Sequence, residues 1–312
     1  MADNTGIEWT DATWNPVTGC DEVSPGCDHC YAKTLAERFR GTPGHYFENG
    51  FDVQLRPERL DQPIRWKRPR MIFVNSMSDL FHKDVPDEFI LGVFAVMAEA
   101  KQHTFQVLTK RHGRMRSLLT AWQERIPWLA EPLPNVWLGV SVEDQQRADL
   151  RVPALLDTPA AVRWISAEPL LGSVDIFASS AIDREPGLDW VVVGGESGKG
   201  ARPMHPNWAR SLRDQCAAAG VPFLFKQWGE WLVDEYIDGD GCRHVGPKPR
   251  ASDPKTLVIH TSGMTALTPD NPFDPWERGH PNWHTVMRRV GKKAAGRVLD
   301  GETHDGYPKA AA

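Results

Sequence analysis

The chain has 312 residues and a formal net charge of −5, from 36 basic and 41 acidic residues. A chain of this length can bury a full hydrophobic core, and its charge argues against a generally polycationic protein. No uninterrupted apolar run approaches the roughly 20 residues that a membrane span needs, and the N-terminus lacks a basic-then-apolar signal. Five cysteines, three of them clustered, do not indicate a disulfide framework, so we expect a reducing, cytoplasmic compartment and no membrane contact.

A loop near the start of the chain contains Cys20, Cys27 and Cys30, spaced as C-x6-C-x2-C. The residues before it are rich in β-branched and aromatic types and predict a strand that breaks at Gly19. The ten residues after Cys30 predict a helix. Between the cysteines, Pro-Gly makes a turn that folds the first cysteine back toward the other two.

Thiolates gathered on one loop are typical ligands of a soft metal. Three of them can hold three irons of a four-iron, four-sulfur cluster and leave the fourth iron open to a ligand. They can also hold zinc together with a fourth residue. The alternatives are three unrelated free cysteines or a redox pair formed by Cys27 and Cys30. We favour the metal because of the Pro-Gly turn, and we predict Cys20, Cys27 and Cys30 as its ligands.

Residues 56–70 form a basic, loop-rich stretch around Trp66. Cations beside an aromatic ring suit a phosphate-bearing strand, because the cations take phosphates while the ring stacks on a base. A solvated surface is the alternative interpretation, and the one we favour. The chain has thirteen tryptophans, several beside polar turn residues. They could line a pocket or groove, but for each of them we favour packing in the core.

The middle of the chain repeats a short apolar run, a polar end and an amphipathic helix. Such runs between helices indicate a parallel sheet covered on both faces, here of about seven strands. We predict a closed or partial (β/α) barrel over residues 1–230, with function at the carboxyl ends of its strands. A doubly wound open sheet is the alternative. The predicted strands are the segment before Cys20 and residues 71–74, 105–109, 136–140, 162–165, 189–193 and 221–225; the predicted helices are 31–40, 87–101, a stretch around 115–122, 144–156 and 207–219.

The alternation of predicted strands and helices ends at about residue 230. Residues 231–312 predict an irregular extension packed on the barrel, with a hairpin at 256–267. The basic residues around 288–297 predict a C-terminal helix packed under the barrel or, as the alternative, a tail that meets an acidic partner. The final residues, 301–312, are expected to be loose. Of the two remaining cysteines, Cys216 is expected in the core and Cys242 in a loop, more as a bystander than as an extra ligand.

Polar residues follow most of the predicted strands. The carboxyl ends of parallel strands meet at one edge, so these residues should gather beside the cysteine loop. Carboxylates there could bind an amine or ribose hydroxyls, and lysines a carboxylate or phosphate, while glycines would let a ligand approach the backbone. Each residue alone fits an ordinary loop hydrogen bond or helix cap equally well. The predicted binding residues are Asn75, Ser76, Asp79, Lys110, Ser141, Glu143, Glu168, Gly194, Gly195, Glu196 and Lys226.

Several short motifs are spread along nearly the whole chain: Trp14–Cys20, Ser24–Ala32, Asn75–His82, Leu108–Arg111, Gly139–Glu143, Ser166–Leu170, Gly194–Ser197 and Lys292–Arg297. Together they resemble a phage- and bacteria-associated three-Cys-motif family of unassigned function, DUF5131. Clustered cysteines after a first strand, on a (β/α) repeat, also resemble the radical S-adenosylmethionine superfamily. The loop has three more residues before its second cysteine than that superfamily's usual C-x3-C-x2-C, and it has His29 where an aromatic residue is usual.

The resemblance implies a radical-SAM-like partial barrel and a radical enzyme. The cysteines would bind three irons of a [4Fe–4S] cluster, and the amine and carboxylate of S-adenosyl-L-methionine would chelate the fourth. One-electron cleavage would then give a 5′-deoxyadenosyl radical that abstracts hydrogen from a substrate. Of the residues, His29 would stack on the adenine, Gly194, Gly195 and Glu196 would face the methionine moiety, and Glu168 or Ser141 the ribose or carboxylate.

The implied partners are an electron donor and a substrate, for which a nucleic acid or nucleotide is our first expectation. The alternative is a zinc- or cluster-stabilised nucleic-acid-binding or hydrolytic protein without radical chemistry. A third hypothesis is a partner-binding barrel without catalysis.

Overall fold

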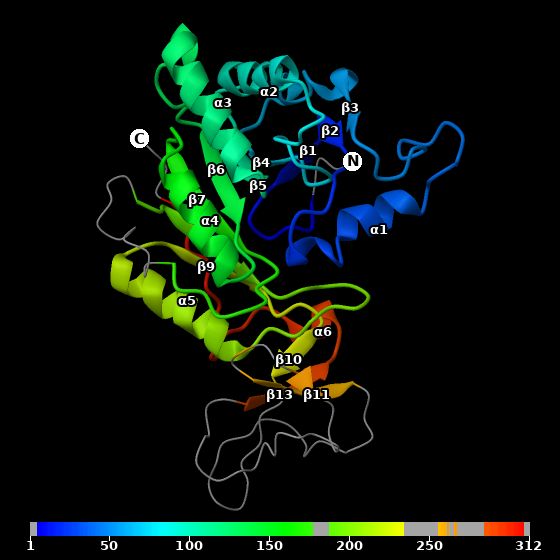
Figure 1. Ribbon diagram of the computed structural model, residues 1–312, viewed down its shortest axis with the longest axis vertical. Coiled ribbons are helices and arrows are strands. Elements are labelled where there is room, and N and C mark those ends of the chain that lie inside the picture. Colours follow the sequence, from blue (N-terminus) through cyan, green and yellow to red (C-terminus); the bar gives the residue numbers. More distant parts are fainter. Residues whose placement is uncertain are drawn as a thin grey trace, which may run out of the picture.

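The computed structural model describes residues 5–176, 187–233, 255–260, 262, 265, 266 and 284–308. Its main element is a seven-stranded parallel sheet that is curled into a half-barrel (Figure 1). The order across the sheet is β1-β4-β5-β6-β7-β8-β9, which is the order along the chain. This confirms the mixed α/β fold and the partial barrel. The doubly wound alternative is wrong, because its strand order would reverse at a switch point.

All seven predicted strands are present, most with bounds within a residue or two of the prediction. They are β1 (Ala12–Trp14), β4 (Met71–Val74), β5 (Thr104–Thr109), β6 (Val136–Ser141), β7 (Val162–Ala167), β8 (Trp190–Gly194) and β9 (Phe223–Gln227). The helices are α1 (Tyr31–Glu37), α2 (Asp87–Glu99), α3 (His112–Arg125), α4 (Gln145–Leu156) and α5 (Pro206–Ala219). Helix α1 ends three residues before the predicted bound.

Side chains of successive strand residues point to opposite faces of the sheet, which divides each apolar run into two sets. One set, including Ile72, Phe105, Leu138 and Val191, packs with apolar residues of α2–α5 in the main core. Those helices lie along one face of the sheet, and α1 lies apart from them (Figure 1). Strands β6, β7 and β8 are buried along their whole length, which confirms the prediction of a sheet covered on both faces. The helices cover one face, and packed side chains of the sheet and of neighbouring segments cover the other.

The concave face has an aromatic floor near the amino ends of the strands. Trp164 packs with Trp9 and Trp190 in a triangle, its ring centroid 5.3 Å from each and theirs 6.1 Å apart. Gly139 makes room for it, since a Cβ there would lie 2.5 Å from the Trp164 ring. Such packing confirms the core interpretation for these tryptophans. We call this set the floor; it consists of Trp9, Phe73, Trp137, Val162, Trp164, Trp190, Val192 and Leu224.

The C-terminal segment packs against strand β9. The backbone N–H of Phe225 donates to the His304 carbonyl at 3.0 Å, and that of Gly306 donates to the Phe223 carbonyl at 3.0 Å. Tyr307 stacks on Trp190. The expectation of a loose terminus is thus wrong for residues 301–308, because they cover the edge of β9 that would otherwise present unpaired backbone groups.

Two smaller sheets flank the half-barrel. β2 (Val17–Thr18) pairs with β3 (Gln54–Leu55), and an antiparallel sheet has the order β10 (Trp231–Val233), β13 (His284–Arg289), β11 (Thr256–His260), β12 (Thr265–Ala266). The antiparallel pairing of β11 with β12 confirms the hairpin. Arg288 and Arg289 lie in β13 because β10 and β11 pair with this segment, so the basic helix is confined to α6 (Lys292–Ala295). Cys242 lies outside the described residues.

Short 3₁₀ helices complete the local structure, at Pro25–Cys27, Pro57–Arg59, Pro63–Arg65 and Pro127–Leu129. Each begins at a proline, whose fixed φ suits the first helical position. None of the helices in the described part of the chain combines the length and the apolar character of a bilayer-spanning helix.

Candidate functional site

The cysteine loop starts from a tightly constrained glycine. Gly19 has a φ of +85°, and a Cβ there would lie 2.1 Å from the Asp52 carbonyl oxygen, so the position requires glycine. Cys20 follows with its N–H donating to Phe51, and Cys30 is the N-cap of α1. Cys20, Cys27 and Cys30 are all half-buried and in no disulfide.

The loop is attached to the carboxyl ends of three strands. Beyond β4, His82 lies 3.0 Å from the carboxylate of Asp21. Just after β6, Glu143 accepts a hydrogen bond from the Ser24 hydroxyl at 2.6 Å. After β8, Arg202 donates to the Pro25 carbonyl at 2.7 Å. The sheet therefore holds the cysteine loop at the edge where the sequence analysis predicted function.

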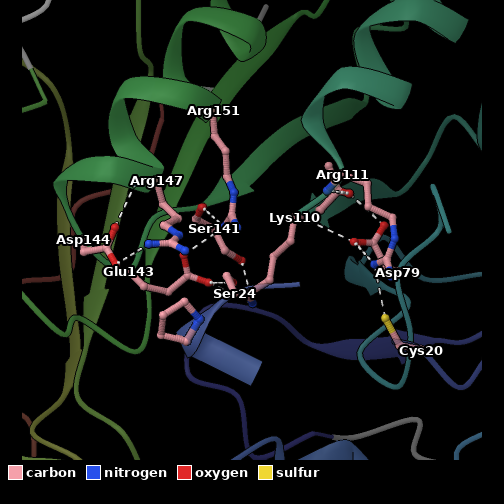
Figure 2. Close-up of polar contacts among 12 residues, drawn as sticks. Cys20, Ser24, Asp79, Lys110, Arg111, Ser141, Glu143, Asp144, Arg147 and Arg151 are labelled. Carbon is pink, nitrogen blue, oxygen red and sulfur yellow. Dashed lines mark hydrogen bonds and ion pairs between the residues drawn. The ribbon is translucent and has the colours of Figure 1, made fainter. Parts of the chain in front are cut away.

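Glu143 is a fully buried anchor at the end of β6 (Figure 2). Arg151 donates to its Oε2 at 2.9 Å, and the Lys110 ammonium lies 3.7 Å from Oε1. Burial alone would raise its pKa, but Lys110, Arg151 and the Ser24 hydroxyl together hold the pKa below the ordinary glutamate value. A Cβ at Gly26 would lie 2.5 Å from this side chain, so the loop backbone rests directly on it.

A second buried carboxylate, Asp79, reaches the loop through Arg111 (Figure 2). It accepts hydrogen bonds from the Thr109 hydroxyl at 2.7 Å and from the Lys110 N–H at 3.0 Å. The Arg111 guanidinium donates to Asp79 at 3.0 Å and to the Cys20 sulfur at 3.2 Å. One cysteine of the loop is therefore in direct contact with a cation held by the end of β5.

The three thiols are a donor set that a soft metal can take. They are free and half-buried, and they lie on one short loop. Three thiolates can bind three irons of a four-iron cluster, or zinc together with a fourth ligand. Among the described residues, Asp21, His82 and Asp84 are the one group of possible metal ligands whose ligand atoms all lie within 4.8 Å of one another. Burial, reinforced by Asp79, raises the pKa of the Cys20 thiol to about 11, so ligation there must release a proton.

Asp21, His82 and Asp84 join the cysteine loop to the turn after β4. The Asp84 N–H donates to His82 Nδ1 at 3.2 Å, and His82 Nε2 lies 3.0 Å from the Asp21 carboxylate. Their ligand atoms lie close enough together to hold a metal ion, and each of the three side chains already has a partner within the protein. The Lys83 ammonium also lies 2.9 Å from Asp84 and 3.5 Å from Asp21. The spacing of the histidines alone could not predict this group.

Glu196, a predicted binding residue, instead joins the loop after β8 to the cysteine loop. Its carboxylate accepts three hydrogen bonds from Arg202 and lies 3.0 Å from His29 Nδ1. Burial raises its pKa, but Arg202 and His29 outweigh burial and lower it overall. The His29 ring also lies close to Gly200, where a Cβ would be 3.0 Å from Nε2. His29 thus makes its polar contact with the protein itself.

Glu168 and Lys226 form a pair at the ends of β7 and β9, with Nζ 2.7 Å from Oε1. Gly194 is beside them, with its Cβ position 3.3 Å from the Glu168 carboxyl carbon. A Cβ on Gly195 would lie 2.0 Å from the Trp228 carbonyl oxygen. The space beside Gly195 is therefore filled by the neighbouring strand end, which explains the glycine by backbone packing rather than by ligand approach.

Asn75 and Ser76 turn the chain at the end of β4. Asn75 has a φ of +60°, and among the described residues its buried Nδ2 has no hydrogen-bond partner. The Tyr31 hydroxyl donates to the Ser76 carbonyl at 2.6 Å, although the side chain of Tyr31 is largely exposed. Tyr31 follows Cys30 directly, so an exposed aromatic ring lies beside the cysteine loop.

A family model described as "Protein of unknown function (DUF5131)" matches residues 4–308. The chain belongs to this family. Comparison with curated proteins and with solved structures gives no match. Membership of DUF5131 assigns no activity, so the function has to be argued from the chemistry of the site.

Several residues of the DUF5131 site were not predicted from the sequence. Ser24, Tyr31, Arg111, Arg151 and Arg202 all contact the loop or its anchors. Arg111 and Arg202 lie beside predicted polar segments, and that proximity was the available signal. Arg151 faces Glu143 from within α4, and helical spacing does not indicate which strand end a helix residue will reach.

The basic stretch 56–70 runs from the strand pair β2–β3 to the amino end of β4. It leads into the amino end of β4, whereas the cysteine loop lies at the carboxyl ends. Arg56 and Arg59 pack over the Tyr46 ring, and Arg70 packs over Trp66. These cations contact aromatic side chains of the protein, as packing residues do.

Proposed function

We propose that this DUF5131 protein is an iron–sulfur enzyme of the radical S-adenosylmethionine type. Cys20, Cys27 and Cys30 would hold a [4Fe–4S] cluster beneath the carboxyl edge of the half-barrel. The observation that carries the proposal is the anchoring of one loop with three free, half-buried thiols to the ends of three parallel strands. Active sites of β/α barrels lie at that edge.

The polar strand ends offer suitable groups for S-adenosyl-L-methionine. With that ligand bound, such a cluster supplies one-electron cleavage to a 5′-deoxyadenosyl radical. Lys226 and Lys110 can bind a carboxylate, and Glu168 can accept from an amine or ribose hydroxyl. The Lys226 and Glu168 side chains are 12% and 19% exposed, so they retain some access to a ligand while already paired. Tyr31 offers an exposed ring beside Cys30.

A nucleic acid or nucleotide is the substrate class that we propose. Lys199, Lys292 and Lys293 are exposed, and Arg289 donates to the Gly198 carbonyl at 3.0 Å. This bond brings the basic β13–α6 segment beside the loop that also carries Arg202. These cations, together with Arg202 at the Pro25 carbonyl, could bind phosphates beside the cysteine loop. The reaction also requires an external electron donor.

The test is cleavage of S-adenosyl-L-methionine by anaerobically reconstituted, dithionite-reduced protein. We expect 5′-deoxyadenosine by chromatography, and a change in the reduced-state electron paramagnetic resonance signal when S-adenosyl-L-methionine is added. The Cys27→Ser variant should lose both signals. The Cys216→Ala variant should keep them, because Cys216 is buried in the core on α5. A colourless wild-type protein with one zinc and no 5′-deoxyadenosine would exclude the radical mechanism.

A further inference from the structure

We infer that Arg111 is a positioning residue that raises the reduction potential of the metal centre through the sulfur of Cys20, and that Asp79 opposes it. This inference rests on the proposed function. It adds a means of setting the reduction potential, which ligation by the cysteines does not itself require.

The geometry places a fixed cation on one ligand sulfur. Arg111 precedes α3, and its Nη1 lies 3.2 Å from Cys20 Sγ while its Nη2 donates to the Asp21 carbonyl at 3.2 Å. The side chain is only 13% exposed. A guanidinium stays charged at any ordinary pH, and its planar fork fixes the directions of its N–H bonds. Within the described residues, Cys20 is the one loop thiol that accepts a hydrogen bond from a cationic side chain.

Asp79 determines where that cation lies. Besides Thr109 and Lys110, the Phe81 N–H donates to its carboxylate at 3.0 Å, so the carboxylate is held by β5 and by its own turn. Its Oδ2 in turn accepts from Arg111 Nη1. Asp79 is 5% exposed, so water screens this arrangement poorly. Once the thiol is deprotonated, the Arg111 guanidinium contacts two negative groups, the Cys20 thiolate and the Asp79 carboxylate.

The direction of each effect follows from electrostatics. Reduction adds one negative charge to a thiolate-held cluster. A hydrogen bond to a ligand sulfur stabilises that charge and raises the potential, whereas a nearby carboxylate destabilises it and lowers the potential. Removing the Arg111 guanidinium should therefore lower the potential, and neutralising Asp79 should raise it. Loosening of the loop would not produce two shifts of opposite sign.

The experiment measures the midpoint potential of the reconstituted cluster in wild type, Arg111→Gln, Asp79→Asn and Arg116→Gln. We expect Arg111→Gln to disfavour reduction at least tenfold, which is a shift of about 59 mV for one electron. Asp79→Asn should shift the potential upward. Arg116→Gln is the matched control, because Arg116 is on the same helix and its ion pair is with Asp157 at the surface. It should leave the potential unchanged.

Iron content separates the possible failures. A wild-type protein that takes up no iron contradicts the proposed function itself. A fully loaded Arg111→Gln protein with the wild-type potential, or the same direction of shift in Arg111→Gln and Asp79→Asn, overturns the inference alone. If Arg111→Gln does not load, Asp79→Asn decides. A potential above wild type then supports the inference, and an unchanged or lower potential overturns it.

Discussion

Trp164 and Ser166 lie two residues apart on the same face of β7, but Trp164 belongs to the aromatic floor and Ser166 to the polar end beside the cysteine loop. Two other strands repeat this change. On β6, Trp137 lies in the floor and Ser141 near Lys110, and on β9, Leu224 lies in the floor and Lys226 at Glu168. We call the carboxyl-end set the rim; it consists of Asp79, Lys110, Ser141, Glu143, Ser166, Glu168, Glu196 and Lys226.

The two regions are stabilised by different physical effects. The floor gains free energy from ring packing and from removing apolar area from water, so it tolerates little change in shape. The rim contains charges that are costly to bury unless each keeps its partner. In β/α barrels the amino ends serve stability and the carboxyl ends serve function. Each of the following predictions tests whether the two regions of this half-barrel differ in that way.

The largest effect is expected in the floor. Trp164→Ala removes a fully buried side chain and should lower the free energy of unfolding by about 3–5 kcal/mol, measured by urea denaturation. Trp128 is 44% exposed, and Trp128→Ala should change the free energy of unfolding by about 0.5 kcal/mol or less. Similar losses in both variants would contradict the structural role of the floor.

A loss of similar size is expected when a rim charge loses its partner. Arg151→Met leaves Glu143 buried without its closest cation and should cost about 3–5 kcal/mol. Arg147 lies one turn earlier on α4 and pairs with Asp144 nearer the surface, so Arg147→Met should cost about 1 kcal/mol or less. The comparison fails if the two arginine variants unfold at the same urea concentration.

Gly139 permits a test of floor geometry with a single methyl group. Gly139→Ala places Cβ against the Trp164 ring and should cost about 1–3 kcal/mol. The control is Gly113→Ala in α3, where a Cβ has no atom within 4 Å. Alanine there should stabilise the protein by roughly 0.5–1 kcal/mol. Thermal unfolding of both variants should therefore shift in opposite directions, and a shared direction would be evidence against tight packing at Trp164.

The smallest predicted effect is a pH dependence that belongs to the rim. The pKa values of Glu143 and Glu196 are lowered in the folded protein. Their stabilisation is thus fully present above the ordinary glutamate pKa of about 4.3 and is lost as the pH falls through their folded values. We expect wild type to lose more stability between about pH 6 and about pH 3 than Glu196→Gln does. If the free energy of unfolding falls equally with pH in wild type and in Glu196→Gln, the Glu196 carboxylate is not stabilised in the folded state.

Much of the half-barrel could be predicted because each strand is a short apolar run bounded by polar residues. The cysteine loop was equally visible, since spacing and the Pro-Gly turn are local features. Tertiary pairing was not visible. Residues 284–289 form a strand because β10 and β11 lie beside them, and Arg202 reaches Pro25 across 177 positions of sequence. The role of Gly195 also depends on Trp228, which only the folded chain brings close.

The most direct test of the account is the iron, sulfide and zinc content of the protein after anaerobic reconstitution, compared with Cys20→Ser and Cys216→Ala. The account predicts about four irons and four sulfides per wild-type chain and per Cys216→Ala chain, with a marked loss in Cys20→Ser. One zinc per chain and no sulfide, in a wild type that stays colourless, would contradict the cluster and leave the loop as a structural zinc clasp.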